Sequence, residues 1–172
     1  LEVALDLARS QNAQELELEI LYNLADLLFT QGDLSAAQRQ FERYSNLAIA
    51  RGFVFKAAKA GNSLGWLMLR LGRHEEAEQF YRDTLDAAER FSDLGLQASV
   101  SSNLGTLLMQ QGRLDAASDC YRQSLERSQQ AGSTRNAIGA QINIAILELV
   151  RNNLDKANEH LKPINDQQSP RI

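Results

Sequence analysis

Residues 103–125 read NLGTLLMQQGRLDAASDCYRQSL, and the spacing of their small and large side chains recurs through the whole chain. Gly112 has counterparts at steps of 40 residues, at Gly32, Gly72 and Asn152. A second series of helix-breaking residues repeats at the same step, at Asn12, Gly52, Ser92 and Gly132. Self-similarity with a period of about 20 to 50 residues is typical of solenoids, in which each unit buries its apolar face only by stacking on its neighbours. The chain therefore consists of one structural unit used about four times.

Large and small side chains alternate at fixed places around each turn. In residues 103–125, Leu104 and Gly105 precede the turn, and Ala117 and Tyr121 follow it. The equivalent pairs in the other units are Ala25 with Phe41, Gly65 with Tyr81, and Ala145 with Leu161. A small residue lets two helices approach closely while the large one fills the remaining gap. This pattern predicts pairs of closely packed helices.

The breakers also set the expected helix ends, because Gly suits the left-handed position that ends a helix and Asn is its usual substitute. The expected helices cover residues 13–31, 33–50, 54–71, 73–90, 94–111, 113–130, 134–151 and 153–162. Pro163 should end the last helix, since proline lacks an N–H and clashes with the preceding turn. We expect an all-α chain with a single domain at 1–164, repeats at 13–52, 53–92, 93–132 and 133–164, and a polar tail at 165–172.

Three segments carry a resemblance to the tetratricopeptide repeat (TPR) family: residues 103–108, 112–117 and 121–125. Residues 61–85 follow the same pattern nearly as closely. The period of 40 residues exceeds the common one of about 34 and is similar to that of Pins-type adaptors, kinesin light chains and bacterial regulatory TPR proteins. The resemblance implies a right-handed α-solenoid of antiparallel helix pairs, the TPR superhelix. It also implies a protein–protein interaction module that binds an extended peptide on its concave surface.

The first residues fit the second helix of an earlier repeat. Residues 4–9 match residues 84–89 when the step of 40 is taken twice, and Leu1 is not a Met. We therefore expect residues 1–12 to be the end of a truncated repeat, within a piece of a longer protein that has at least one more repeat upstream.

The concave surface is assigned by the resemblance to the first helix of each repeat. On a helical wheel of 100° per residue, the face opposite the buried Leu–Gly column forms the expected peptide groove across repeats one to three. The candidate peptide-binding residues are Glu19, Tyr22, Asn23, Asp26, Lys59, Asn62, Trp66, Arg70, Ser102, Asn103, Thr106 and Asn143.

Asparagine recurs at one position of this face, at Asn23, Asn103 and Asn143, with Ser63 in the remaining repeat. An amide side chain can donate to a peptide carbonyl and accept from a peptide N–H at once, so a ladder of them could hold an extended chain whatever its sequence. Similar asparagines grip peptide backbones in Pins-like and kinesin-light-chain-like repeats. The alternative is that these amides cap or bond locally within their own repeat.

Trp66 and the charged residues of the groove suggest which residue types the peptide contains. Trp66 points toward the groove on the wheel and would be an aromatic anchor, with core packing against the next repeat as the alternative. Glu19 and Asp26 in the first repeat face Lys59 and Arg70 in the second, which favours a basic segment followed by an acidic one. Chaperone C-terminal tails are not expected, because Tyr22 and Asp26 occupy the positions of the usual Lys/Asn clamp.

The first helix of the fourth repeat is apolar on nearly every side. We expect both faces of such a helix to pack against other residues. Its candidate assembly surface consists of Ile142, Ile146, Leu149 and Val150. The cover could be the tail from Ile164, a further repeat, or a second chain. The alternative function is therefore a regulatory or oligomerisation segment of a larger bacterial signalling or transcription-regulating protein.

Other function classes find little support. The 172 residues are 44% hydrophobic and 23% charged with a net charge of -4, and no stretch is long and apolar enough to span a membrane. Residues 61–65 match the G-x-S-x-G elbow but lie in an expected helix without the strand that the motif needs. His74, His160 and Cys120 show no metal-ligand spacing. We expect no enzyme activity, cofactor, nucleic acid or membrane insertion, and a cytoplasmic protein.

Overall fold

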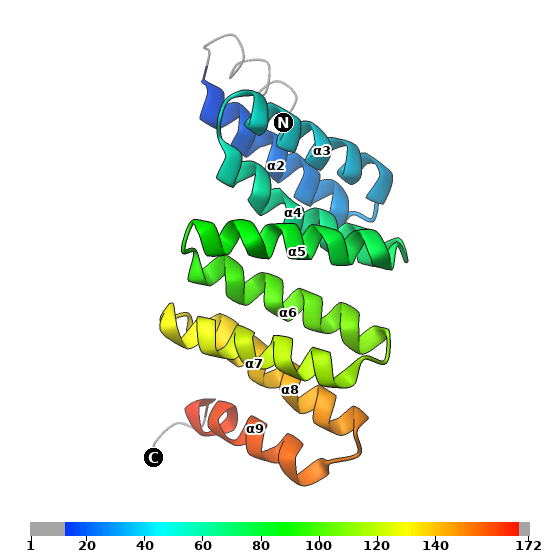
Figure 1. Cartoon of the computed structure of the whole chain (residues 1–172), viewed down its shortest axis with the longest axis vertical. Helices are drawn as coiled ribbons and strands as arrows, with labels where there is room; N and C mark the ends of the chain where they lie inside the picture. Colours follow the sequence, from blue (N-terminus) through cyan, green and yellow to red (C-terminus); the bar gives the residue numbers. More distant parts are fainter. Residues whose placement is uncertain (1–12, 169–172) are drawn as a thin grey trace. The chain divides into compact units, whose positions relative to one another are not determined.

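The computed structural model describes residues 13–168, apart from the side chains of residues 163 and 165–168, and every regular element in this range is an α-helix (Figure 1). The helices are α2 (Gln14–Thr30), α3 (Leu34–Ala50), α4 (Val54–Arg70), α5 (His74–Arg90), α6 (Leu94–Gln110), α7 (Leu114–Gln130), α8 (Thr134–Val150) and α9 (Leu154–Gln168). The expected truncated repeat at 1–12 lies outside the described residues. None of the helices is long and apolar enough to cross a membrane.

The turns follow the predicted breaker series. Gly32, after α2, has a φ of +85°, and its N–H donates to the carbonyl of Phe29 while the N–H of Asp33 donates to that of Leu28. Ser92 and Asn152 stand at glycine positions of the register and adopt the same left-handed conformation, with φ of +54° and +62°. The repeat therefore imposes this turn even where a side chain makes it costly. Asp33 caps α3, since its carboxylate accepts from the N–H of Ala36.

The helix prediction is confirmed to within one residue for every end except the last. The expectation that Pro163 ends the final helix is wrong, because α9 continues to Gln168. A proline inside a helix costs roughly 3 kcal/mol. Continuing the helix places Ile164, which is only 8% exposed, on the same face as buried Ala157. Burial of one such side chain offsets about 1.5–3 kcal/mol, so packing opposes the local effect of the proline. Residues 169–172 of the expected tail lie outside the described part.

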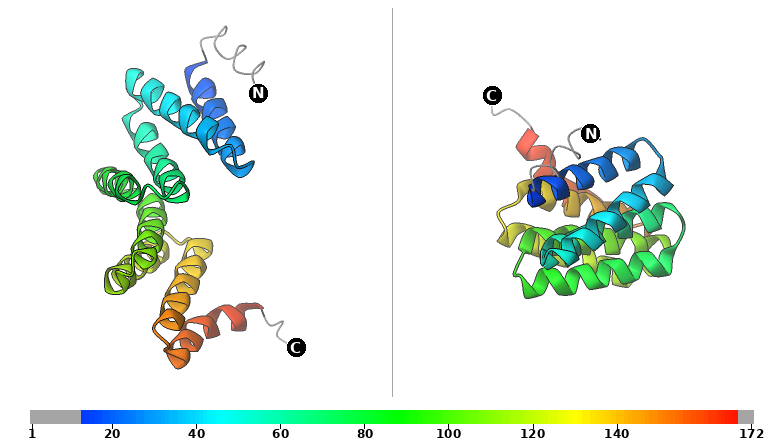
Figure 2. Two further views of the ribbon diagram at one scale, coloured as in Figure 1. Left: turned by 90° about the vertical axis from the view of Figure 1, so that its right-hand side faces the viewer. Right: turned by 90° about the horizontal axis from the view of Figure 1, so that it is seen from above.

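The chain divides into two compact units, Leu1–Ala87 and Ala88–Ile172. In the first unit, α3 packs on both α2 and α4, which lie side by side with it in Figure 2 (blue to teal). In the second unit, α7 packs on α6 and α8, α8 also packs on α9, and the two first helices α6 and α8 touch directly.

Each unit contains the predicted contact between a glycine and an aromatic ring. A Cβ added to Gly65 would lie 2.6 Å from Cε1 of Tyr81, and one added to Gly105 would lie 2.7 Å from Cε1 of Tyr121. Both tyrosines are fully buried. Since no side chain fits in that space, the small residue before the turn is what lets the ring of the second helix enter.

Candidate functional site

The first helices of the first two repeats, α2 and α4, are joined by three side-chain contacts. The residues are seven apart along each helix, and each contact joins a residue of α2 to the residue 41 positions later in α4. The contacts are Glu15 to Lys56 (2.9 Å), Tyr22 to Ser63 (2.8 Å) and the ring of Phe29 to the guanidinium of Arg70 (5.6 Å). Because seven residues make about two helical turns, the same faces of the two helices stay in contact along their length. This row of three contacts is called the seam below.

The second unit has a corresponding contact between α6 and α8. The amide nitrogen of Asn143 donates to the hydroxyl of Ser102 at 2.9 Å, again with an offset of 41 residues. Two of the predicted groove residues therefore contact each other across repeats.

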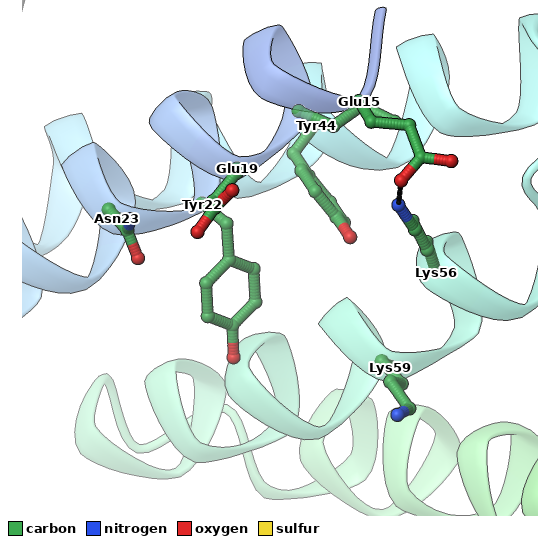
Figure 3. Close-up of a pocket in the computed structure, with 8 residues that line it drawn as sticks. Glu15, Glu19, Tyr22, Asn23, Tyr44, Lys56 and Lys59 are labelled. Carbon is green, nitrogen blue, oxygen red and sulfur yellow. Dashed lines mark hydrogen bonds and ion pairs between the residues drawn. The ribbon is translucent and has the colours of Figure 1, made fainter.

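Beside the seam of the first unit lies a pocket of about 460 Å³ between α2, α3 and α4 (Figure 3). Four of the predicted peptide-binding residues line it: Glu19, Tyr22, Asn23 and Lys59. Its remaining lining residues are Glu15, Leu18, Tyr44 and Lys56. The structure therefore brings together residues from two repeats that the sequence had assigned to one groove.

The inner part of the pocket is aromatic. The ring of Tyr22 packs edge-on against those of Tyr44 and Phe41, with centroids 5.4 and 5.5 Å apart. Tyr44 is buried, and its hydroxyl forms no hydrogen bond with any other residue between 13 and 168. Burial raises the pKa of Tyr44, and the neighbouring Tyr22 raises it further. Tyr44 thus stays protonated at neutral pH and can both donate to and accept from a group that enters the pocket.

The two walls of the pocket carry opposite charges. Glu15 and Glu19 come from α2, and Lys56 and Lys59 come from α4. Lys56 pairs with Glu15 at 2.9 Å, and the ammonium of Lys59 lies 4.8 Å from the centre of the Phe55 ring. Asn23 is exposed at the edge, and its amide makes no hydrogen bond with another described residue. The pocket therefore combines an apolar base with hydrogen-bonding groups and both signs of charge.

A smaller pocket of about 210 Å³ occurs at the equivalent place of the second unit. Adding 80 to the number of a residue in the first pocket gives its counterpart here for seven of the eight positions. Its lining consists of Ala98, Ser99, Ser102, Asn103, Ser124, Arg135, Asn136 and Gly139. The repeat thus builds a pocket between two first helices and one second helix, and the side chains decide its character. Asparagine is retained in both, at Asn23 and Asn103, whereas Ser102 and Ser124 replace the two tyrosines.

The other predicted groove residues lie outside the two pockets. Asp26 is exposed on α2, whereas Asn62 and Trp66 are half-buried on α4. Arg70 stacks on Phe29. Thr106 is half-buried, and its hydroxyl donates to the carbonyl of Ser102 and accepts from the hydroxyl of buried Tyr121 at 3.3 Å. Among the described residues, no three His, Cys, Asp or Glu side chains gather where they could hold a metal ion.

Sequence reasoning missed Tyr44, Glu15 and Lys56. Tyr44 belongs to α3, a second helix, and the groove had been assigned to first helices alone. Its counterparts Thr84 and Ser124 are small, so an aromatic residue at this place in the 40-residue register was the available signal. Glu15 and Lys56 each stand about one turn before a predicted residue of their own helix, Glu19 and Lys59 respectively.

The predicted assembly surface lies exposed on α8. The exposed fractions of Ile142, Ile146, Leu149 and Val150 are 39%, 41%, 49% and 57%. Ile142 and Leu149 occupy the register positions that Tyr22 and Phe29 use to contact the next first helix in the first unit. The backbone of residues 164–168 continues α9.

Comparisons with known proteins agree with the repeat pattern. Two sequence profiles, both described as tetratricopeptide repeat, match residues 22–90 and 96–162. A search of the curated proteins gives no match. The structure is similar to BtubC (BKLC) from P. vanneervenii, with a TM-score of 0.76 and 22% identity over 89% of this chain and 63% of that one. It is also similar to the apo form of RapI, with a TM-score of 0.76 and 11% identity over 92% of this chain and 45% of that one.

At these identities the two structures show the fold alone, and the chain spans less than two thirds of the length of either. The two profile matches together cover most of the sequence, and both are to the same repeat class. Repeats of this class are non-enzymatic scaffolds for protein–protein interaction, and their helix pairs form an all-α solenoid. The chain belongs to the tetratricopeptide repeat family.

Proposed function

We propose that this interaction module binds an extended segment of a partner protein on the face formed by its first helices, and that the pocket around Tyr22 and Tyr44 receives one of its side chains. The observation that carries the proposal is the lining of that pocket, in which Glu19, Tyr22, Asn23 and Lys59 from two repeats meet around a space of about 460 Å³. Such a volume lies within the range of small binding pockets, about 300–1,000 Å³.

The hydrogen-bonding groups of the pocket suit a peptide. The amide of Asn23 and the hydroxyl of Tyr44 have no partner among the described residues, so a bound main chain could satisfy both without displacing an internal bond. An extended segment exposes its N–H and C=O groups, which helices satisfy internally. The aromatic base would meanwhile bury an apolar side chain.

The charges of the walls give the ligand a direction. A basic residue would lie toward Glu19 of α2, and an acidic residue toward Lys59 of α4. Complementary charges of this kind favour one orientation and suppress the reverse one more than they add affinity. We therefore propose a ligand with a basic residue, an apolar residue and an acidic residue in succession. The same face in the second unit, around Asn103 and Ser102, would hold polar side chains.

Site-specific photo-crosslinking tests the proposal. A benzophenone amino acid replaces Asn23 in one variant and Arg39, an exposed residue of α3, in a matched control. After irradiation in cells of the source organism, the segment crosslinked only through position 23 is identified and synthesised as a peptide. Its dissociation constant is then measured with the unmodified chain and with Lys59→Glu, Glu19→Lys and the double variant.

The proposal predicts that each single charge reversal weakens the peptide roughly tenfold, or about 1.4 kcal/mol, and that a peptide with the reversed charge order recovers affinity for the double variant. Circular dichroism must show that all variants unfold at similar temperatures. A peptide that binds every variant equally, or crosslinking equal from both positions, would rule out this pocket as the site.

The exposed row on α8 favours a second candidate, self-association. A two-fold axis could pack Ile142, Ile146 and Leu149 of two copies against each other as a self-complementary surface. Sedimentation over a hundredfold range of concentration tests it with the double variant Ile146→Lys, Leu149→Lys. Leu16→Lys with Leu27→Lys, at similarly exposed apolar positions of α2, is the matched control. A dimer abolished only by the α8 variant supports the candidate, whereas a monomer at every concentration excludes it.

A further inference from the structure

A second groove of the first unit lies between α3 and α5, with α4 at its base. Its volume is about 490 Å³. The walls include Ile49 of α3 and Phe80 of α5, and Val54 stands at the start of α4. This groove shares no lining residue with the pocket around Tyr22 and Tyr44, and nothing in the proposed function uses it.

The other repeats show which of these side chains the fold requires. Ser45, in the wall of the groove, stands where the next two repeats have Leu85 and Leu125. A serine is shorter than a leucine by more than a methyl group, so the groove has room that a leucine would occupy. The fold does not need a small residue here, because two repeats of the same chain do without one.

Two further departures make the groove apolar. Ile49 stands where the following repeats carry Glu89 and Gln129, and it is 60% exposed. Phe80 occupies a position that holds Gln40 and Cys120 in the neighbouring repeats. At this exposure, Ile49 buries little apolar surface within its own repeat. Three coordinated departures around one groove indicate a binding surface.

The rim of the groove is acidic on both sides. Glu42 on α3 and Asp83 on α5 are exposed, and each accepts a hydrogen bond of 2.8 Å from a glutamine four residues earlier, Gln38 and Gln79 respectively. Gln38 and Gln79 orient the two carboxylates, and the guanidinium of Arg73, which donates to Gln38, lies close enough to Glu42 to interact with its charge. The lining of the groove itself contains no basic side chain.

We propose that this groove binds an amphipathic helix of a partner protein that sets apolar residues between Ile49, Val54 and Phe80 and places Lys or Arg beside Glu42 and Asp83. A helix suits the site because two flanking helices over a third leave a trough into which the side-chain ridge of another helix can pack. Charge complementarity selects a basic rather than an acidic helix.

A displayed library of helical peptides tests the inference. The peptides are 20 residues long with a randomised face, and they are selected against the whole chain. Selected peptides are then measured against Ser45→Leu and Ile49→Glu, which install side chains that other repeats already accommodate and should not disturb the fold. Lys59→Glu, in the separate pocket of the proposed function, is the control.

The expected result is enrichment of helices with apolar residues at spacings of three and four and with Lys or Arg at both edges. Either groove variant should weaken them at least tenfold, and Lys59→Glu should leave them unchanged. Exchange of the peptide's Lys and Arg for Glu should abolish binding. No enrichment, enrichment of acidic helices, or binding to the groove variants that is as tight as to the unmodified chain would overturn the inference. Loss of binding on Lys59→Glu alone would instead place the peptides in the other pocket.

Discussion

The side-chain amide of Asn143 donates a hydrogen bond to the hydroxyl of Ser102, 2.9 Å away on the first helix of the preceding repeat. This bond assigns Asn143 a structural role between repeats rather than within its own. Asn23 stands at the same place in the register, yet its amide has no partner among residues 13–168 and faces a pocket. One column of asparagines therefore contains residues with different surroundings, and sequence position alone does not show which of them can meet a ligand.

Replacing Asn143 by alanine should cost stability, whereas the same change at Asn23 should not. Loss of one partly buried hydrogen bond typically costs about 0.5–1.5 kcal/mol. We expect Asn143→Ala to lower the free energy of unfolding by about that amount and Asn23→Ala to stay within about 0.5 kcal/mol of the unmodified chain. Urea unfolding followed by circular dichroism measures both. Equal effects would mean that the bond to Ser102 is not formed in solution.

Gly105→Ala should destabilise the second unit. The added methyl would lie 2.7 Å from Cε1 of Tyr121, which is fully buried and cannot move aside freely. Overpacking of this kind costs about 1–3 kcal/mol. Thermal unfolding should show a lower transition temperature for this variant.

Two further variants separate the clash from a general effect of alanine. Gly139→Ala meets nothing within 4 Å and should stabilise by up to about 1 kcal/mol through helix propensity. Tyr121→Leu combined with Gly105→Ala reproduces the Ala145 and Leu161 pair of the fourth repeat and should recover part of the loss. If Gly105→Ala alone left the unfolding temperature unchanged, the contact with Tyr121 would not restrict the size of the residue at position 105.

Ser92→Gly should raise stability. Ser92 has a φ of +54°, and a left-handed conformation costs a residue with a Cβ about 1–2 kcal/mol. Glycine removes this strain but loses more freedom on folding, so the net gain should be about 0.5–1 kcal/mol. The reciprocal change, Gly132→Ala, should be destabilising at the equivalent turn of the next repeat, where φ is +66°. Chemical denaturation of both variants gives the comparison, and a destabilised Ser92→Gly would contradict it.

Glu148 should make the second unit sensitive to acid. It is buried at a position that holds Leu28, Met68 or Leu108 in the other repeats. The amide of Asn153 donates to its carboxylate at 2.8 Å and the guanidinium of Arg151 at 3.3 Å, and these bonds hold the pKa of Glu148 below its usual range. A lowered pKa contributes stability that is fully present above the unfolded-state value and is lost as the pH falls through the folded-state value.

The matched variant is Glu148→Leu, which restores the residue type of the other repeats. Replacement of a buried ion pair by an apolar side chain is often neutral or stabilising. We expect this variant to be at least as stable at neutral pH and to lose less stability between neutral pH and the acid range below the ordinary carboxyl pKa. Unfolding temperatures across this range provide the measurement. If the unmodified chain and Glu148→Leu lost stability equally with falling pH, carboxylates other than Glu148 would account for the acid sensitivity.

Much of the fold could be predicted because its signals are local. The left-handed turns at Gly32 and Asn152 follow from backbone sterics at single residues, and the Gly105 and Tyr121 pair follows from a fixed spacing. Pro163 shows where local reasoning fails. Its backbone preference competes with the burial of Ile164, which depends on packing that no single residue encodes.

The candidate site was only partly predictable. Glu19, Tyr22, Asn23 and Lys59 lie in one pocket as the first-helix face suggested, but Tyr44 enters from a second helix. A helical wheel describes one helix at a time, so it cannot show which neighbouring element completes a pocket. The offset of 41 residues between contacting first helices was likewise absent from the wheel.

The sequence by itself determined the place of the turns and the ends of most helices between residues 13 and 168, because these depend on the spacing of the breakers and on the conformational limits of single residues. Only the tertiary structure decided which polar groups meet each other and which remain available. Tyr22 bonds to Ser63 and Asn143 to Ser102, while Tyr44 and Asn23 face open space. The physical reason is that a hydrogen bond forms only at short range and in a suitable direction, and those distances are set by how whole helices pack.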